Sequence, residues 1–194
     1  MKARSISYVA FFTALTAVGA AIKIPVPYIP FTLQILAVYL AGALLGPRLG
    51  SLSIVCYVGI GLLGVPVFAE GGGLGYLFKP TFGYLLGYIL GAYVNGWLIC
   101  RFDLSSIRSI FVANAATLLT VYLFGCIWLY GAMKWFADAP LSLGQTVLYG
   151  FIIPAPGDVL LCMLCAIIIQ RVRPRLSKFI HIKELNHPWA KPTL

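Results

Sequence analysis

The chain has 194 residues, of which 61% are hydrophobic and 10% are charged. A soluble domain is about half apolar and about a quarter charged. This composition therefore indicates an integral membrane protein and leaves no room in these residues for a soluble catalytic domain. The net charge of +9 does not indicate nucleic-acid binding. The basic residues flank the apolar runs, where such residues usually set membrane topology.

Six apolar segments follow one another along the chain. A membrane-spanning helix needs about 17–25 residues, so the second and third segments are short. They either cross with little tilt, extend into their flanks, or form a hairpin that does not cross fully. A cleaved signal peptide is the alternative for the first segment, but that segment is long enough to span. We expect an all-α integral membrane protein with six transmembrane helices over the ranges Ser5–Ile22, Phe31–Leu45, Gly50–Leu63, Thr81–Cys100, Ser109–Tyr130 and Val147–Gln170.

The distribution of basic residues predicts the orientation. If the N-terminus is cytoplasmic and the segments alternate, 11 of the 14 Lys and Arg residues lie on the cytoplasmic side. Only Lys23, Lys79 and Lys134 lie outside. This bias is typical of the positive-inside rule. We expect a multi-pass plasma-membrane protein with both termini cytoplasmic, in which residues 1–176 form the transmembrane domain and 177–194 a polar cytoplasmic tail.

Asp158 is the only acidic residue inside these long apolar runs. A charged side chain at the centre of a bilayer costs about 2.5–3.5 kcal/mol or more, and such residues usually face a cavity or a partner. The preceding run, Pro154-Ala-Pro-Gly157, interrupts a helix. We expect the helix to restart at Asp158, with free N–H groups lining a cavity for a polar ligand. The alternative is a proline kink with Asp158 acting only as an N-cap.

Other polar groups are expected at the same depth in the outer half of the bilayer. The two outer connections, 23–31 with three prolines and 65–76 with several glycines, are apolar for segments exposed to water. They either pack on lipid headgroups or cover a cavity that opens outward. The layout suits a small ligand that offers N–H donors to the acid and an anionic end to a lysine. The candidates beside Asp158 are Gln34, Tyr84, Thr81, Thr32 and Lys79.

Small residues predict close helix contacts. Gly83, Gly87 and Gly91 recur every four residues, and Asn95 continues their face, so this stripe favours tight packing on another helix. In the first segment, the alanine pairs favour either internal packing or docking on another membrane subunit. No nucleophile–base pair, metal cluster or phosphate-binding loop is visible, so we expect no enzyme, no metal and no cofactor. The alanines are Ala10, Ala14, Ala17 and Ala21.

Five motifs in order resemble the biotin-transporter substrate-binding subunits of the BioY family, the S components of energy-coupling factor (ECF) transporters. The resemblance covers nearly the whole chain, from the first segment to about Arg171. Each motif is weak alone and specific only in combination. They are Pro30-Phe-Thr-Leu-Gln34, Leu45-Gly-Pro-Arg-Leu-Gly50, Gly64-Val-Pro-Val-Phe-Ala69, Pro80-Thr-Phe-Gly-Tyr84 and Pro156-Gly-Asp158.

This resemblance implies the six-helix S-component bundle and high-affinity binding of biotin from outside, beneath the first and third connecting loops. The partners it implies are membrane lipid, a transmembrane coupling protein and two ATPases that power uptake, and the alanines of the first segment match the docking surface for the coupling protein. It places Asp158 in the biotin site, where the carboxylate accepts ureido N–H groups. Candidates for polar contacts are Gln34, Thr32 and Tyr84, and candidates for apolar walls are Phe68 and Tyr88.

Two positions depart from the family pattern. Leu161 stands where many members carry a lysine, and Lys79 stands where glycine is usual. We hypothesise that Lys79 supplies the missing charge and meets the valerate carboxylate of biotin. The departures keep an S component for another vitamin open as an alternative. Two further alternatives belong to other classes of protein. One is a membrane-embedded enzyme that uses Asp158 as acid or base, and the other is a structural subunit without a ligand.

Overall fold

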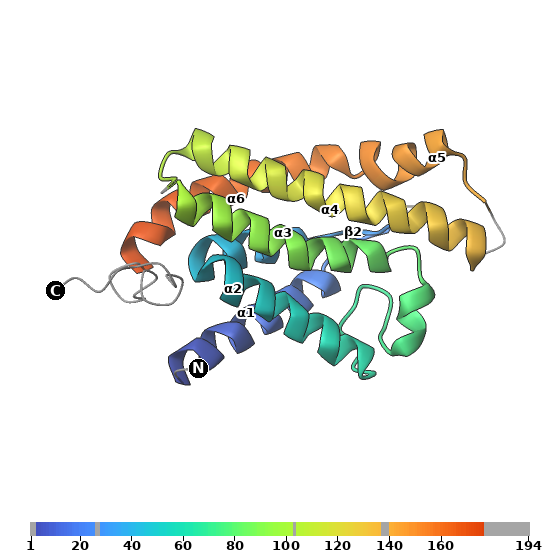
Figure 1. Ribbon diagram of the computed structural model, residues 1–194, viewed down its shortest axis with the longest axis horizontal. Helices are drawn as coiled ribbons and strands as arrows, with labels where there is room; N and C mark the ends of the chain where they lie inside the picture. The colour runs from blue at the N-terminus through green and yellow to red at the C-terminus, as the bar shows by residue number, and fades with distance from the viewer. Residues whose placement is uncertain (1–2, 26–27, 103, 137–139, 177–194) are drawn as a thin grey trace.

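The computed structural model describes residues 3–25, 28–102, 104–136 and 140–176, and most of these are helical. Its long helices pack side by side in a bundle (Figure 1). Within the described ranges, five helical stretches are long and apolar enough to cross a membrane, the last of them running from Leu143 to Pro174. The prediction of an all-α membrane protein is confirmed, and the count of six crossings stays a prediction. The long helices are α1 (Ala3–Ala21), α2 (Gln34–Leu62), α3 (Phe82–Arg101), α4 (Ile107–Trp135) and α6 (Ala155–Leu176).

The ends of the long helices lie toward two opposite ends of the molecule. The start of α1, the connection between α3 and α4 and the end of α6 lie toward one end, on the left of Figure 1. The short helix η1 (Leu74–Phe78) and the end of α4 lie toward the other. The predicted tail 177–194 falls outside the described residues.

Helix α2 contains most of both short segments and reverses direction between them, whereas Phe31 and Thr32, predicted to begin the second helix, form a strand instead. At Gly46 the backbone has φ 79° and ψ −178°, and Pro47 follows. Only glycine adopts such a conformation without strain. Gln34 Nε2 donates to the Tyr57 hydroxyl at 2.7 Å. In a straight helix these residues would be about 34 Å apart, so the two halves run back alongside each other.

The glycine stripe of α3 packs on α4, as the sequence predicts. A Cβ on Gly87 would lie 2.8 Å from the Val121 Cα, and one on Gly83 would lie 2.1 Å from the Trp128 Cβ. Asn95, at the end of the stripe, donates to Asn114 Oδ1 at 2.9 Å. The stripe therefore brings the α3 and α4 backbones together, and the buried Asn95–Asn114 hydrogen bond joins the two helices further along α3.

The last segment differs from the expectation. It comprises α5 (Leu143–Val147), the π-helical turn η2 (Leu148–Ile152) and α6, which already begins at Ala155. The Asp158 amide donates to the Pro154 carbonyl at 3.1 Å. The prediction that the helix restarts at Asp158 is therefore wrong, and so is the N-cap alternative. The N–H groups in the first turn of a helix have no partner within the helix, so a proline there loses no hydrogen bond. Pro154 and Pro156 therefore mark the start of α6 rather than a break within it.

A small antiparallel ribbon precedes α2. Strand β1 (Lys23–Ile24) pairs with β2 (Phe31–Thr32), and Lys23 stands opposite Thr32. The Gly157 position of α6 touches this ribbon, because a Cβ there would lie 2.6 Å from the Phe31 ring. The ribbon thus places Thr32 beside the beginning of α6.

Candidate functional site

A pocket of about 570 Å³, counting the space at its open mouth, lies between the ribbon, the starts of α2, α3 and α6, and the middle of α4. Asp158, Gln34 and Thr32 line it, as do Thr81 and the tyrosines at 84 and 88. Six of the eight predicted binding residues therefore meet in one cavity. The described part of the chain contributes no lysine or arginine to its lining.

Asp158 faces this pocket with one hydrogen bond to its carboxylate. The Tyr122 hydroxyl donates to Asp158 Oδ2 at 2.6 Å. Tyr122 is itself held edge-on against Phe151, with ring centroids 4.8 Å apart. Among the described residues, none bonds to the other carboxylate oxygen, Oδ1. The acid therefore keeps lone pairs for an N–H donor from a ligand.

A series of hydrogen bonds also fixes the polar groups that the ribbon and the start of α2 contribute to the pocket. Thr32 Oγ1 donates to Gln34 Oε1 at 3.0 Å, and Gln34 Nε2 donates to the Tyr57 hydroxyl. That hydroxyl donates in turn to the Val67 carbonyl at 3.0 Å. The series connects the ribbon, both halves of α2 and the loop before η1, so it orients the Gln34 amide at the pocket wall.

The remaining predicted polar groups bond to nearby segments. The Tyr84 hydroxyl donates to the Gly150 carbonyl of η2 at 2.8 Å, so its proton is already engaged. Thr81 Oγ1 donates to the Tyr76 hydroxyl at 3.1 Å. Burial raises the pKa of Tyr76 above its ordinary value, because a phenolate would lose hydration, and the phenol stays neutral. These tyrosines form amphipathic walls that suit an apolar ring with polar edges.

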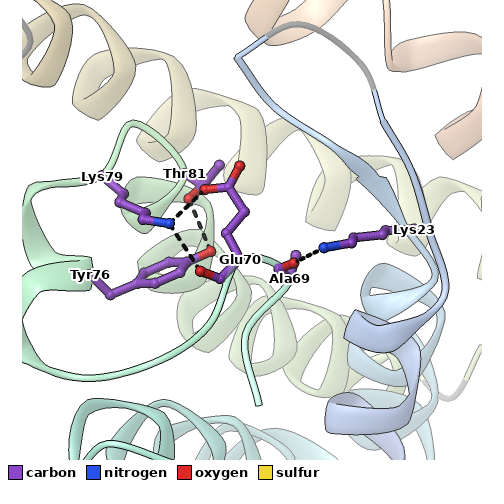
Figure 2. Close-up of polar contacts among 6 residues, drawn as sticks. All are labelled: Lys23, Ala69, Glu70, Tyr76, Lys79 and Thr81. Carbon is purple, nitrogen blue, oxygen red and sulfur yellow. Dashed lines mark hydrogen bonds and ion pairs between the residues drawn. The ribbon is translucent and has the colours of Figure 1, made fainter. Parts of the chain in front are cut away.

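Two predicted residues do not line the pocket. Lys79 Nζ lies 3.2 Å from Glu70 Oε2 and donates to the Glu70 carbonyl at 3.0 Å (Figure 2). Phe68 is buried and packs on the Tyr76 ring, with centroids 4.5 Å apart. Phe68 therefore supports a lining residue from behind. The hypothesis that Lys79 meets a ligand carboxylate stays a prediction.

Sequence reasoning missed Tyr122 and Tyr76, which both line the pocket. Tyr122 carried a usable signal. It lies deep inside an apolar run, where a phenol needs a hydrogen-bond partner just as an acid does. Tyr76 carried none, because a tyrosine in a glycine-rich loop is ordinary. Leu161, at the departure noted above, is partly buried and packs against the core.

The fold and the pocket are those of a multi-pass membrane protein whose described residues surround a cavity with polar side chains in its lining. A family model described as the BioY family matches residues 1–178. The chain belongs to the BioY family. It is 41% identical over 187 residues to a "Probable biotin transporter BioY" of Lysinibacillus sphaericus, covering 94% of this chain and 95% of the relative. Another protein with that description, from Pyrococcus horikoshii, is 41% identical over 130 residues, covering 66% and 76%.

The fold has a solved counterpart. A crystal structure of the S-component for biotin from an ECF-type ABC transporter matches with a TM-score of 0.78 and 24% identity, covering 89% of this chain and 92% of that one. The chain therefore has the S-component fold. Family membership also confirms the prediction of a transport protein rather than an enzyme.

Proposed function

We propose that this chain is the biotin-binding subunit of a biotin uptake system. The observation that carries the proposal is the carboxylate of Asp158, which faces the pocket with one oxygen open to an N–H donor. The curated relatives described as biotin transporters support the identity of the ligand. Biotin carries a ureido ring with two N–H groups, an apolar thioether ring and a valerate carboxylate.

The polar groups of the pocket suit one orientation of biotin. One ureido N–H group approaches Asp158 Oδ1, and a bond to a carboxylate contributes about 1.5–3 kcal/mol. Gln34 and Thr32 offer polar contacts at the ring. Tyr84 and Tyr88 provide apolar walls. The valerate carboxylate points away from Asp158, because two like charges in a poorly hydrated pocket repel each other.

We further propose six crossings with both termini in the cytoplasm. The pairing of Gln34 with Tyr57 supports a return crossing within α2. The charge distribution along the sequence supports the orientation. Residues 1–176 then form the binding domain, and the polar tail follows on the cytoplasmic side.

A coupling protein with two ATPases is the proposed energy source for release inward. The exposed face of α1 is its proposed docking surface, because small exposed residues let a partner helix approach closely. Ala10, Ala14 and Ala21 are exposed there, and Ala17 is partly buried.

Equilibrium binding of labelled biotin to the detergent-purified protein tests the function. Saturable binding is expected, and Asp158→Asn should weaken it by about tenfold or more, since it removes the charge that accepts the ureido group. Asp103→Asn is the matched control, because it makes the same change outside the apolar runs. Absence of binding by a folded wild-type protein would refute biotin as the ligand, and a panel of other vitamins would then test the alternative S component.

A further inference from the structure

Lys23 projects from β1 toward the pocket. It stands directly opposite Thr32 in the antiparallel ribbon. Side chains of directly opposed residues lie on the same face of a ribbon. Thr32 is buried and lines the pocket. The register therefore sends the Lys23 side chain to the pocket side of the ribbon, although its backbone lies in an exposed connection.

The Lys23 ammonium reaches across to the opposite side of the mouth. Its Nζ donates to the carbonyl oxygen of Ala69, a residue that lines the pocket. Figure 2 shows Lys23 and Lys79 approaching consecutive residues of this loop from opposite sides. The Lys23 side chain thus extends from the ribbon, where it stands opposite Thr32, to Ala69 in the loop before η1.

The two lysines differ in the compensation of their charge. Lys79 is ion-paired with Glu70. In the described part of the chain, the only other acid is Asp158, and its carboxylate bonds to Tyr122. Lys23 therefore has a carbonyl partner but no carboxylate partner among the described residues. A carbonyl satisfies one of the three ammonium donors and leaves the charge uncompensated.

We propose that Lys23, rather than Lys79, is the specificity residue for the anionic end of the ligand. This inference rests on the proposed function. With the N–H groups of biotin at Asp158, the valerate chain leads to the mouth of the pocket, where Lys23 spans from the ribbon to Ala69. The ligand carboxylate takes a second ammonium donor of Lys23, while the first stays on the Ala69 carbonyl. The Lys79–Glu70 pair remains intact.

Binding of biotin and of its neutral carboxamide, biotinamide, to the same purified variants tests this inference. The wild type should prefer biotin by about tenfold or more, as expected for a charge-assisted hydrogen bond. Lys23→Gln keeps a donor for the Ala69 carbonyl but removes the charge, so it should lose this preference. Lys23→Arg should keep it. The distant Lys134→Gln is the matched control that should also keep it, and so should Lys79→Gln if Lys79 remains paired with Glu70.

Each outcome separates the inference from the function. A preference retained by Lys23→Gln overturns the inference, and so does a wild type that binds both ligands equally. Equal loss of both ligands in Lys23→Gln assigns Lys23 a structural role in holding the loop and also overturns it. Loss of the preference in Lys79→Gln alone supports the sequence-based hypothesis for Lys79. A folded wild type that binds neither ligand refutes the proposed function itself.

Discussion

Asp158 is paired with a phenol rather than with a base. The bond from Tyr122 delocalises part of the negative charge without neutralising it, and it holds the carboxylate in one rotamer. An acid held by a cation would offer a ligand little electrostatic gain. The Tyr122–Asp158 pair therefore keeps the charge available at a defined position.

Tyr122→Phe should weaken biotin binding by about tenfold, because the bond to a charged group is lost and the carboxylate becomes free to rotate. The rest of the ring still packs on Phe151, so the fold should be preserved. Calorimetric titration with biotin measures the effect. Tyr130→Phe is the matched control, since Tyr130 lies two turns further along α4 and does not line the pocket. Equal affinities in the two variants would contradict a positioning role for Tyr122.

The expected depth of each residue in the membrane was enough to predict several residues of the site. It was not enough to predict which side chains line the pocket. Counting residues along the apolar runs placed Asp158, Gln34 and Tyr84 at one level, and the structure brings them into one pocket. Counting does not give the rotation of a helix or the path of a loop. Lys79 was therefore placed at the correct end of the molecule, but its contact with Glu70 was not foreseen.

At the scale of the helices, the α3–α4 contact supports the pocket from behind. Val121 lines the pocket on one side and contacts Gly87 on the other. A side chain at Gly87 would meet backbone atoms, which cannot move aside as a flexible side chain does.

Gly87→Ala should destabilise the protein by about 1–3 kcal/mol, because it forces α3 and α4 apart. It should also weaken biotin binding, since Val121 moves with the α4 backbone. Thermal unfolding in detergent measures the first effect. Gly59→Ala is the control: it too is a helical glycine, but a Cβ there meets nothing within 4 Å. That substitution should be neutral or stabilise by up to about 1 kcal/mol. Equal thermal stability of both variants would count against the packing argument.

The positions of the long helices were predictable from hydropathy, and their local breaks were only partly so. The two short segments hinted at the reversal in α2, yet only the conformation of Gly46 shows where it occurs. The π-helical turn η2 left no signal, because one extra residue in a helical turn does not change an apolar pattern. Prolines suggested a break at Asp158, whereas Pro154 directly precedes α6 and Pro156 lies in its first turn.

At the scale of the whole molecule, the reversal in α2 decides the side of the membrane on which the later loops lie. If α2 returns, the β1 connection and the η1 loop share one side. Lys23 of the former contacts Ala69 of the latter, which supports this arrangement. A single crossing by α2 would separate them by the thickness of the bilayer.

Labelling of intact cells with a membrane-impermeant maleimide checks the topology. After replacement of the five native cysteines, Ile24→Cys and Leu74→Cys should both react, because these positions are 61% and 69% exposed and we propose that both connections lie outside the cell. Ser105→Cys, in the connection between α3 and α4, should react only after the cells are permeabilised. Reaction of only one of the first two variants would contradict the return crossing.

Trp128 gives the molecule an optical property of its own. Its indole N–H donates to the Lys79 carbonyl at 3.1 Å, and its ring packs on Phe82 at the start of α3. Thr81, between these two contacts, lines the pocket. Indole emission responds to the polarity and hydrogen bonding around the ring. The chain has four tryptophans, and Trp128 is the one joined to the backbone beside this pocket residue. The emission of Trp128 is therefore expected to change when a ligand fills the pocket.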